Sequence, residues 1–245
     1  YVTAPVLLYF WTWRQTHTTQ NVMDSYAQAL VNAGSTLAQA FEEYVVWNFF
    51  TGSRAVMVSG VSQFGYDDAG ITGYPTAVLA ATHNSYPVSS SVSGIENLGA
   101  KMIRLNTAGE AGLEIDFNGQ DGVQMSAMWA IRSDTNTVEW GRIELDGNND
   151  GSIVLDVRDA TMAALIPVVT QTTGSIYSAT YTVEPNSMAE CDPGDINDDS
   201  TLDVSDLVRL VALILGNGEP PNDVELCAAD VNEDNQTSVQ DVVTL

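Results

Sequence analysis

The first 58 residues carry apolar side chains at helical spacing. They open with the aromatic stretch APVLLYFWTWRQ, which predicts a mostly buried helix, and the following MDSYAQALVNAG predicts a second helix ending at Gly34. Ser35 can cap a third helix, and Gly52 closes it. We expect one side of that third helix to present Leu37, Phe41, Tyr44, Val45 and Asn48. Residues 1–58 are therefore predicted to be a helical segment.

Two adjacent carboxylates, Glu42 and Glu43, fall within the third predicted helix. A pair of carboxylates could do acid–base chemistry, but neighbouring glutamates on a helix are more typical of its water-facing side. We expect both side chains to be solvated.

Residues 59–98 show neither the helical spacing of apolar residues nor the alternation typical of strands, and they are rich in Gly, Ser, Tyr and Pro. This composition is typical of turns and loops. We expect an irregular connection here, with the run SSSVSG, from Ser89 to Gly94, marking a junction before the next domain.

From residue 99 to 185 the pattern alternates with period two, which is typical of half-buried strands. In GLEIDFNG, Leu113, Ile115 and Phe117 would face inward while the two acids between them face water. Turns rich in Gly, Asn and Asp separate seven candidate strands: KMIRLNT, GLEIDFNG, GVQMSAMWAIRSD, VEWGRIELDG, GSIVLDVRD, AALIPVVTQ and SIYSATYTVEP. This spacing predicts an antiparallel β-sandwich.

The last segment, residues 191–245, places oxygen-bearing side chains at fixed intervals before two apolar helices. Counted from Asp195, oxygens fall at positions 1, 3, 5, 9 and 12, and position 7 can offer its backbone carbonyl. The spacing recurs 35 residues later, from Asp230. Calcium loops use this arrangement because a hard cation collects six to eight oxygen ligands. The predicted ligands of two calcium ions are Asp195, Asn197, Asp199, Thr201, Asp203 and Asp206, then Asp230, Asn232, Asp234, Gln236, Ser238 and Asp241.

This duplicated pattern, with Asp at position 12, resembles the paired calcium repeats of a type I dockerin. The resemblance covers 191–245 and implies docking onto a cohesin-like protein. The sequence departs from the family at position 6, usually Gly, which is Ser200 and Asn235. It departs again at positions 10 and 11, often Ser-Thr, which are Val204-Ser205 and Val239-Gln240.

Two cysteines flank these loops: Cys191 precedes Asp195 by four residues, and Cys227 precedes Asp230 by three. Because paired calcium loops lie side by side about a pseudo-twofold axis, equivalent flanks can approach each other. We expect a Cys191–Cys227 disulfide and an oxidising, extracellular location, with two buried free thiols as the alternative.

The chain is strongly acidic, with 32 Asp and Glu against 8 Lys and Arg, for a net charge of −24. Such a balance argues against nucleic acid as a partner, because nucleic-acid binding needs basic patches. No apolar run reaches the length of a membrane span. Secretion into calcium-rich surroundings fits this composition.

A second resemblance covers the first part of the chain. The segment AFEEYVVWNFFTGSRA, followed by GYPTAVLAATHNSYP, resembles the region downstream of the zinc-binding helix in certain secreted bacterial metalloproteases. No HExxH motif occurs, so no catalytic residue can be assigned from that family. The resemblance implies the non-catalytic, C-terminal part of a protease-like precursor.

Together, these patterns predict an α+β, multidomain chain: a helical segment (1–58), an irregular connection (59–98), a sandwich (99–185) and a dockerin-like calcium module (191–245). The predicted function is extracellular attachment or assembly, with a cohesin-like protein or another copy of the chain as partner. Two alternatives stay open: a structural subunit of an extracellular filament, and a hydrolase with an unrecognised site.

Overall fold

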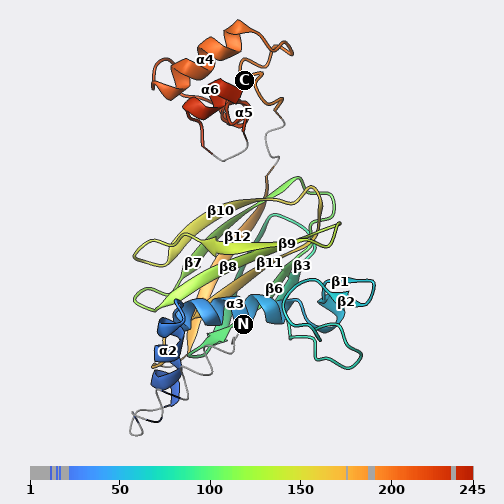
Figure 1. Cartoon of the computed structure of the whole chain (residues 1–245), viewed down its shortest axis with the longest axis vertical. Helices are drawn as coiled ribbons and strands as arrows, with labels where there is room; N and C mark the ends of the chain where they lie inside the picture. The colour runs from blue at the N-terminus through green and yellow to red at the C-terminus, as the bar shows by residue number, and fades with distance from the viewer. Residues whose placement is uncertain are drawn as a thin grey trace. The chain divides into compact units, whose positions relative to one another are not determined.

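In the computed structural model the chain divides into two compact units, residues 1–186 and 187–245 (Figure 1). The structure describes residues 12, 15, 17, 22–174, 176–186, 191–232 and 236–244. The helix expected in APVLLYFWTWRQ lies almost wholly outside the described residues.

The first unit contains two α-helices, a 3₁₀ turn and twelve strands among its described residues. The helices are α2 (Val22–Asn32) and α3 (Leu37–Phe49), and the 3₁₀ turn is η1 (Gly52–Arg54). The strands are β1 (Met57–Val58), β2 (Val61–Ser62), β3 (Ala81–His83), β4 (Val88–Ile95), β5 (Gly99–Ala100), β6 (Ile103–Leu105), β7 (Gly112–Gly119), β8 (Met125–Ser133), β9 (Val138–Ile143), β10 (Asp150–Asp156), β11 (Ala160–Val169) and β12 (Tyr177–Asn186).

Helix α3 begins one residue later than expected. Thr36, not Ser35, is its N-cap: the Thr36 side chain accepts a hydrogen bond from the Gln39 N–H, and the Gln39 side chain accepts one from the Thr36 N–H. This reciprocal pair satisfies two backbone donors that a helix start leaves open, which is why Thr36 is favoured over Ser35. The helix ends at Phe49 with Phe50 as its C-cap, two residues before the expected Gly52.

Two sheets form a sandwich, and each of the seven strands expected between residues 101 and 185 is present. A four-stranded sheet has the order β10-β7-β12-β4, and the other sheet has the order β3-β6-β11-β8-β9 with β5 paired to β11. All strand pairs are antiparallel except β3 with β6. A continuous apolar core lies between the sheets and includes Leu113, Ile115 and Phe117, as predicted.

A third layer covers the outer face of the larger sheet. Val45, Val46 and Phe49 of α3 pack with Met128 of β8 and Ile166 of β11 in a second apolar cluster (Figure 1). Because β11 is covered on both faces, eight consecutive residues of it, 162–169, are buried. Helix α3 and the larger sheet therefore share this second apolar cluster.

The predicted face of α3 was partly wrong. Tyr44 is about half exposed, at 51%, whereas Glu42, predicted to be solvated, is 3% exposed. The Glu42 carboxylate accepts a hydrogen bond from the Ser126 hydroxyl (2.5 Å) and pairs with the Arg142 guanidinium. A glutamate can face a sheet when the sheet supplies a hydroxyl and a cation, and local periodicity does not show which strands will supply them.

The expected irregular connection contains a full strand. The run SSSVSG lies inside β4, which pairs with β12 at the edge of the four-stranded sheet. Val92 and Ile95 of β4 are buried, while Ser89, Ser91 and Ser93 are exposed. Serine has a weak strand propensity, so the alternation in this segment was masked by its composition.

The second unit contains α4 (Val204–Ile214), α5 (Asp223–Ala229) and α6 (Val239–Thr244). In the described part of this unit the buried apolar core is small: it contains Ile196, Leu210, Ala228 and Ala229, with Cys191, Leu213, Ile214 and Val242 packed around them.

Candidate functional site

The first predicted calcium loop forms a tight turn held by its own carboxylates. Asp195 is 6% exposed. Its Oδ1 accepts a hydrogen bond from the Asp199 N–H (3.1 Å) and its Oδ2 accepts one from the Ser200 N–H (2.7 Å). Ser200, at position 6, has φ of +64°, the left-handed geometry for which Gly is usual. The backbone therefore turns sharply at the expected place without a glycine.

The position-12 carboxylate closes the same loop. Asp206 is fully buried. Its Oδ1 accepts from the N–H groups of Ile196 (2.9 Å) and Asn197 (3.2 Å), and its Oδ2 accepts from Asp203 N–H (2.9 Å). Asp203 also caps α4 by accepting from Ser205 N–H. The two ends of the loop are thus joined through Asp206.

The second loop repeats this closure. Asp241 is also fully buried, and its carboxylate accepts from the N–H groups of Asn232 (3.2 Å) and Ser238 (2.7 Å). These donors occupy positions 3 and 9, as Asn197 and Asp203 do in the first loop. Asp234 and Asn235 lie outside the described residues. Where both loops are described, the duplicated sequence gives duplicated geometry.

Hydrogen bonding keeps both position-12 carboxylates acidic. The N–H of Asp203, followed by those of Asn197 and Ile196, lowers the pKa of Asp206 against the opposing effect of burial. Burial raises the pKa of Asp241, but hydrogen bonds from Ser238 and Asn232 outweigh it, and the net shift is downward. Both groups are therefore ionised at neutral pH.

The predicted ligands that the structure describes lie in the two expected turns, but their carboxylates do not converge on one point. Within the described residues, no group of three or more His, Cys, Asp or Glu side chains is close enough to hold a metal ion. The Asn197 amide donates to Asp199 Oδ2 (3.0 Å), and Asp230 serves as the C-cap of α5. The donor set is composed of carboxylate, amide, hydroxyl and carbonyl oxygens, which suits a hard cation such as Ca²⁺.

The predicted disulfide is present. Cys191 and Cys227 are bonded, with their Cα atoms 6.0 Å apart. The bond ties the segment before the first loop to α5, which leads into the second loop. Beside it, the Gly194 N–H donates to the Ala228 carbonyl at 2.9 Å. The two repeats are thus fastened together at equivalent flanks, as the sequence suggested.

A pair of apolar residues is exposed at matching places in the two repeats. Val204 and Val239 occupy position 10 and are 69% and 65% exposed, while Val208 and Val243 occupy position 14 and are 64% and 83% exposed. Val211 and Leu215 of α4 are also exposed. Sequence reasoning noted the valines at position 10 only as a departure from the dockerin pattern; their repetition at position 14 was the available signal.

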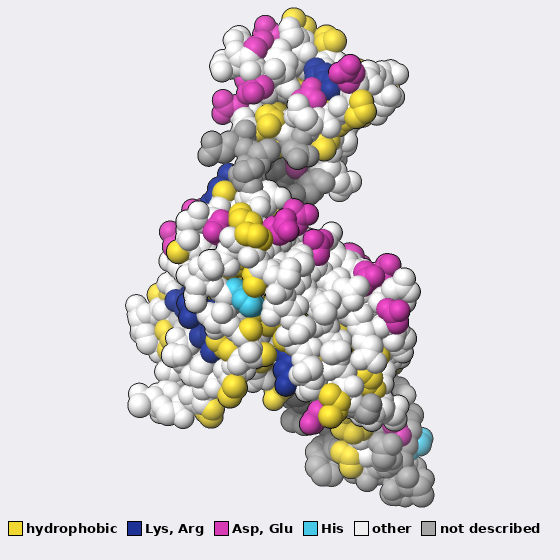
Figure 2. Space-filling model, turned by 180° about the vertical axis from the view of Figure 1, so that it is seen from behind, with side chains coloured by type: hydrophobic (Ala, Val, Ile, Leu, Met, Phe, Trp, Pro, Cys, Tyr) yellow, Lys and Arg dark blue, Asp and Glu magenta, His cyan; other side chains and the backbone are white. Residues whose placement is uncertain are grey.

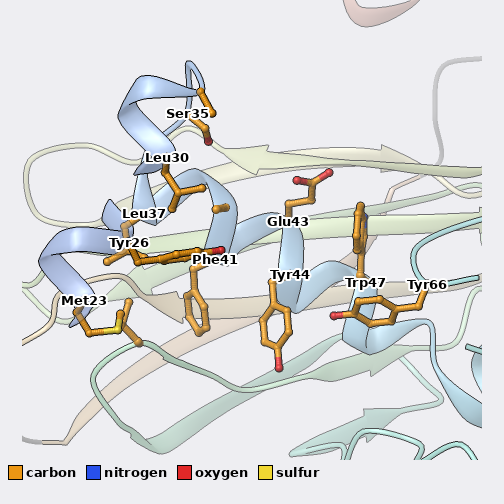
Figure 3. A pocket seen from close by; sticks show the side chains of 13 residues that line it. Met23, Tyr26, Leu30, Ser35, Leu37, Phe41, Glu43, Tyr44, Trp47 and Tyr66 are labelled. Carbon is orange, nitrogen blue, oxygen red and sulfur yellow. The ribbon is translucent and has the colours of Figure 1, made fainter. Parts of the chain in front are cut away.

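In the first unit, an aromatic groove of about 520 Å³ lies along α2 and α3 (Figure 3). Phe41, Tyr44 and Trp47 line it along α3, and Tyr26 and Tyr66 line it from neighbouring segments. The rings of Phe41 and Tyr44 stack at 6.0 Å, and those of Trp47 and Tyr66 meet edge to face at 5.5 Å. The groove could take a flat or aliphatic group by apolar contact.

Acidic side chains are spread over the face shown in Figure 2, and basic ones occupy a few spots. In the part of the chain that the structure describes, no helix is both long and apolar enough to cross a bilayer.

Comparisons with known proteins give a distant likeness only. No family model matches the chain, and no curated protein matches it. Among solved structures, the pre-peptidase C-terminal domain of collagenase from Bacillus anthracis is 13% identical and aligns over 45% of this chain and 100% of that domain, with a TM-score of 0.35.

Two further structures show the same level of likeness. The mitogen of Yersinia pseudotuberculosis is 13% identical over 43% of this chain and 92% of its own, with a TM-score of 0.29. PliG of Aeromonas hydrophila, a periplasmic inhibitor of g-type lysozyme, is 11% identical over 43% and 95%, with a TM-score of 0.28. TM-scores below 0.5 establish neither a family nor a function for this chain.

Proposed function

We propose that this protein is a secreted modular segment whose C-terminal unit, stabilised by two calcium ions, attaches it to a protein partner. The observation that carries the proposal is the duplicated valine pair: Val204 and Val208 in one repeat, Val239 and Val243 in the other. A unit with a small core would gain by burying these side chains, yet it exposes them at equivalent positions. Exposed apolar side chains that recur in this way are typical of a surface that meets another protein.

Calcium is the cation that best suits the two loops. Their potential ligands are oxygens alone, and Asp206 and Asp241 are ionised and buried. In the first loop, Asp195 and Asp199 would supply ligands at positions 1 and 5, and Thr201 its carbonyl. Bound calcium would offset the repulsion among these carboxylates, so the metal would act as a folding ligand for the unit.

The partner we favour is a cohesin-like protein, in keeping with the dockerin-like spacing of the loops. The sandwich then belongs to the non-catalytic part of a protease-like precursor. The Cys191–Cys227 disulfide supports secretion, because such bonds persist in oxidising compartments. Self-assembly into a filament is the competing arrangement, in which the same valines would meet another copy of the chain.

A direct test combines a metal titration with a binding measurement. Isothermal calorimetry of the chelator-treated protein should show two calcium sites per chain, and Asp195→Ala and Asp230→Ala should each remove one. Binding to an immobilised cohesin domain should require calcium and should be lost in the double variant Val208→Asp/Val243→Asp. Val154→Asp, at a 45% exposed valine of β10, is the matched control and should bind normally.

Light scattering in calcium separates the two partners. A monomer that binds the cohesin supports the attachment role. A large assembly that the Val208→Asp/Val243→Asp substitutions disperse would favour the filament instead. Absence of calcium binding to the native protein would refute both arrangements.

A further inference from the structure

The outer face of the four-stranded sheet forms a shallow groove of about 810 Å³. It is lined by all four strands, and its lining includes Ser89 and Ser91 of β4, Thr180 and Thr182 of β12, Asp116 of β7 and Asp150 of β10. Helix α3 covers the other sheet of the sandwich, whereas no described helix of this unit packs on this face. Most of the polar side chains on this face are exposed: Ser89, Ser91, Asp116, Asn118, Ser152 and Thr180.

Strand register sets the polar side chains in two rows across the sheet. One row runs Asp150, Asn118, Thr180, Ser91, and the next runs Ser152, Asp116, Thr182, Ser89. Each step between strands is about 4.8 Å, so a row of four spans about 14 Å. That spacing approximates the repeat of sugar units in an extended polysaccharide, so a chain lying across the strands could present one unit to each strand.

The side chains in these rows are short, which is unusual for a merely solvated face. Water-facing strands commonly carry Lys, Arg or Glu, whose long side chains fill the space above a sheet and lose much entropy when they are fixed. Here Ser, Thr, Asn and Asp leave a hollow and need little ordering. Thr182 already donates to Asp116 Oδ2 at 3.2 Å. A partner with many hydroxyl groups could exchange hydrogen bonds with this face at small entropic cost.

Charge narrows the class of ligand. The four strands carry five carboxylates, Glu114, Asp116, Asp150, Asp156 and Glu184, and no Lys or Arg. Arg158, which follows β10, pairs with Asp156. Asp150 lines the groove and is itself partly exposed, while its Oδ1 is buried and has no hydrogen-bond partner among the described residues. A buried carboxylate oxygen of this kind is stabilised by a cation or a strong donor.

We propose that this groove binds a linear polysaccharide that bears protonated amino groups. Sugar hydroxyls would meet the Ser and Thr rows, and ammonium groups would meet Asp116 and Asp150.

The test uses the full chain and a hexamer of glucosamine, titrated by calorimetry at low salt. We expect binding that weakens at least about tenfold, a change of 1.4 kcal/mol, in Asp116→Asn/Asp150→Asn. Thr180→Val should weaken binding more modestly. Asp134→Asn/Thr137→Val, which makes the same kinds of change at the exposed β8–β9 turn, is the matched control and should bind as the native protein does.

Three comparisons can overturn the proposal. The N-acetylated hexamer, which lacks the charge, should bind at least about tenfold less tightly, and an uncharged glucose hexamer likewise. If the glucosamine, N-acetylglucosamine and glucose hexamers all bound with equal affinity, the ammonium groups would have no role in binding. If an oligolysine peptide bound as tightly as the glucosamine hexamer, the binding would depend on net charge alone. If the glucosamine hexamer did not bind at all, the proposal would be wrong.

Discussion

The two units of this chain are stabilised in different ways. In the sandwich, one apolar core lies between the sheets and a second lies beneath α3, and both include large residues such as Phe117 and Phe49. Among the described residues of the C-terminal unit, four buried apolar residues form the core, and two of them are alanines. Instead, that unit carries a disulfide and two carboxylate-closed loops.

This difference follows from size. A chain of about 60 residues buries too little apolar surface to offset its conformational entropy with a wide margin. Covalent and metal cross-links supply the remainder in many small domains. We therefore expect the stability of the sandwich to depend on its packing, and the stability of the C-terminal unit to depend on its cross-links.

Removal of calcium should have the largest effect, confined to the C-terminal unit. Calcium at a thousand times its dissociation constant stabilises a folded site by about 4 kcal/mol. The combined stabilisation from two such sites is larger than the stability that so small an apolar core can supply. Calorimetric melting in calcium and then in chelator should show one transition that collapses and one that stays in place. If both transitions kept their temperatures, calcium would have no structural role here.

Loss of the disulfide should be the next largest effect. The bond joins residues 36 apart in sequence, and loop-closure entropy for that length gives about 4 kcal/mol. Cys191→Ser/Cys227→Ser should therefore lower the unfolding free energy of the C-terminal unit by that order, measured by urea denaturation in calcium. The sandwich transition of the same variant provides the internal control. Equal destabilisation of both units would contradict their independence.

Glu42→Gln should destabilise the sandwich unit by about 2 kcal/mol. This is less than the roughly 3–5 kcal/mol typical for breaking a buried ion pair, because the Arg142 side chain is 47% exposed and can regain water. Glu139→Gln, at an exposed acid of β9, should change stability by less than about 0.5 kcal/mol. Chemical denaturation of both variants provides the measurement. A Glu42 variant as stable as the control would mean that packing alone holds α3 on the sheet.

Thr36→Ala should have the smallest effect, about 1 kcal/mol, because it removes the side-chain acceptor at the start of α3. Ser35→Ala, one residue earlier, should change stability by less than about 0.5 kcal/mol. Thermal melts of the two variants distinguish the true cap from its neighbour. If the two variants had equally shifted melting temperatures, the Thr36 side chain would not be the stabilising cap.

The sequence predicted the parts of the fold that rest on local periodicity. Leu113, Ile115 and Phe117 alternate cleanly, and β7 has the expected bounds. The cysteine flanks of the repeats predicted the disulfide correctly. Calcium and its ligands remain a prediction, because the described carboxylates form hydrogen bonds but no metal cluster.

What the sequence missed depends on contacts between distant segments. Glu42 is buried because Ser126 and Arg142, 84 and 100 residues away, satisfy its carboxylate. The strand β4 was hidden because serine usually signals a turn, and only its pairing with β12 makes it a strand. The polar groove also exists only after four strands, separated in sequence, come into register.

The burial of β11 on both faces has a consequence for how the chain must be made. The run AALIPVV is apolar and carries no charge, so a β11 that lost its cover would expose a large hydrophobic surface through which chains can associate. Helix α3 precedes it in the sequence, so during synthesis this cover emerges before the strand that it protects. Proteolytic removal of α3 should therefore make the protein insoluble.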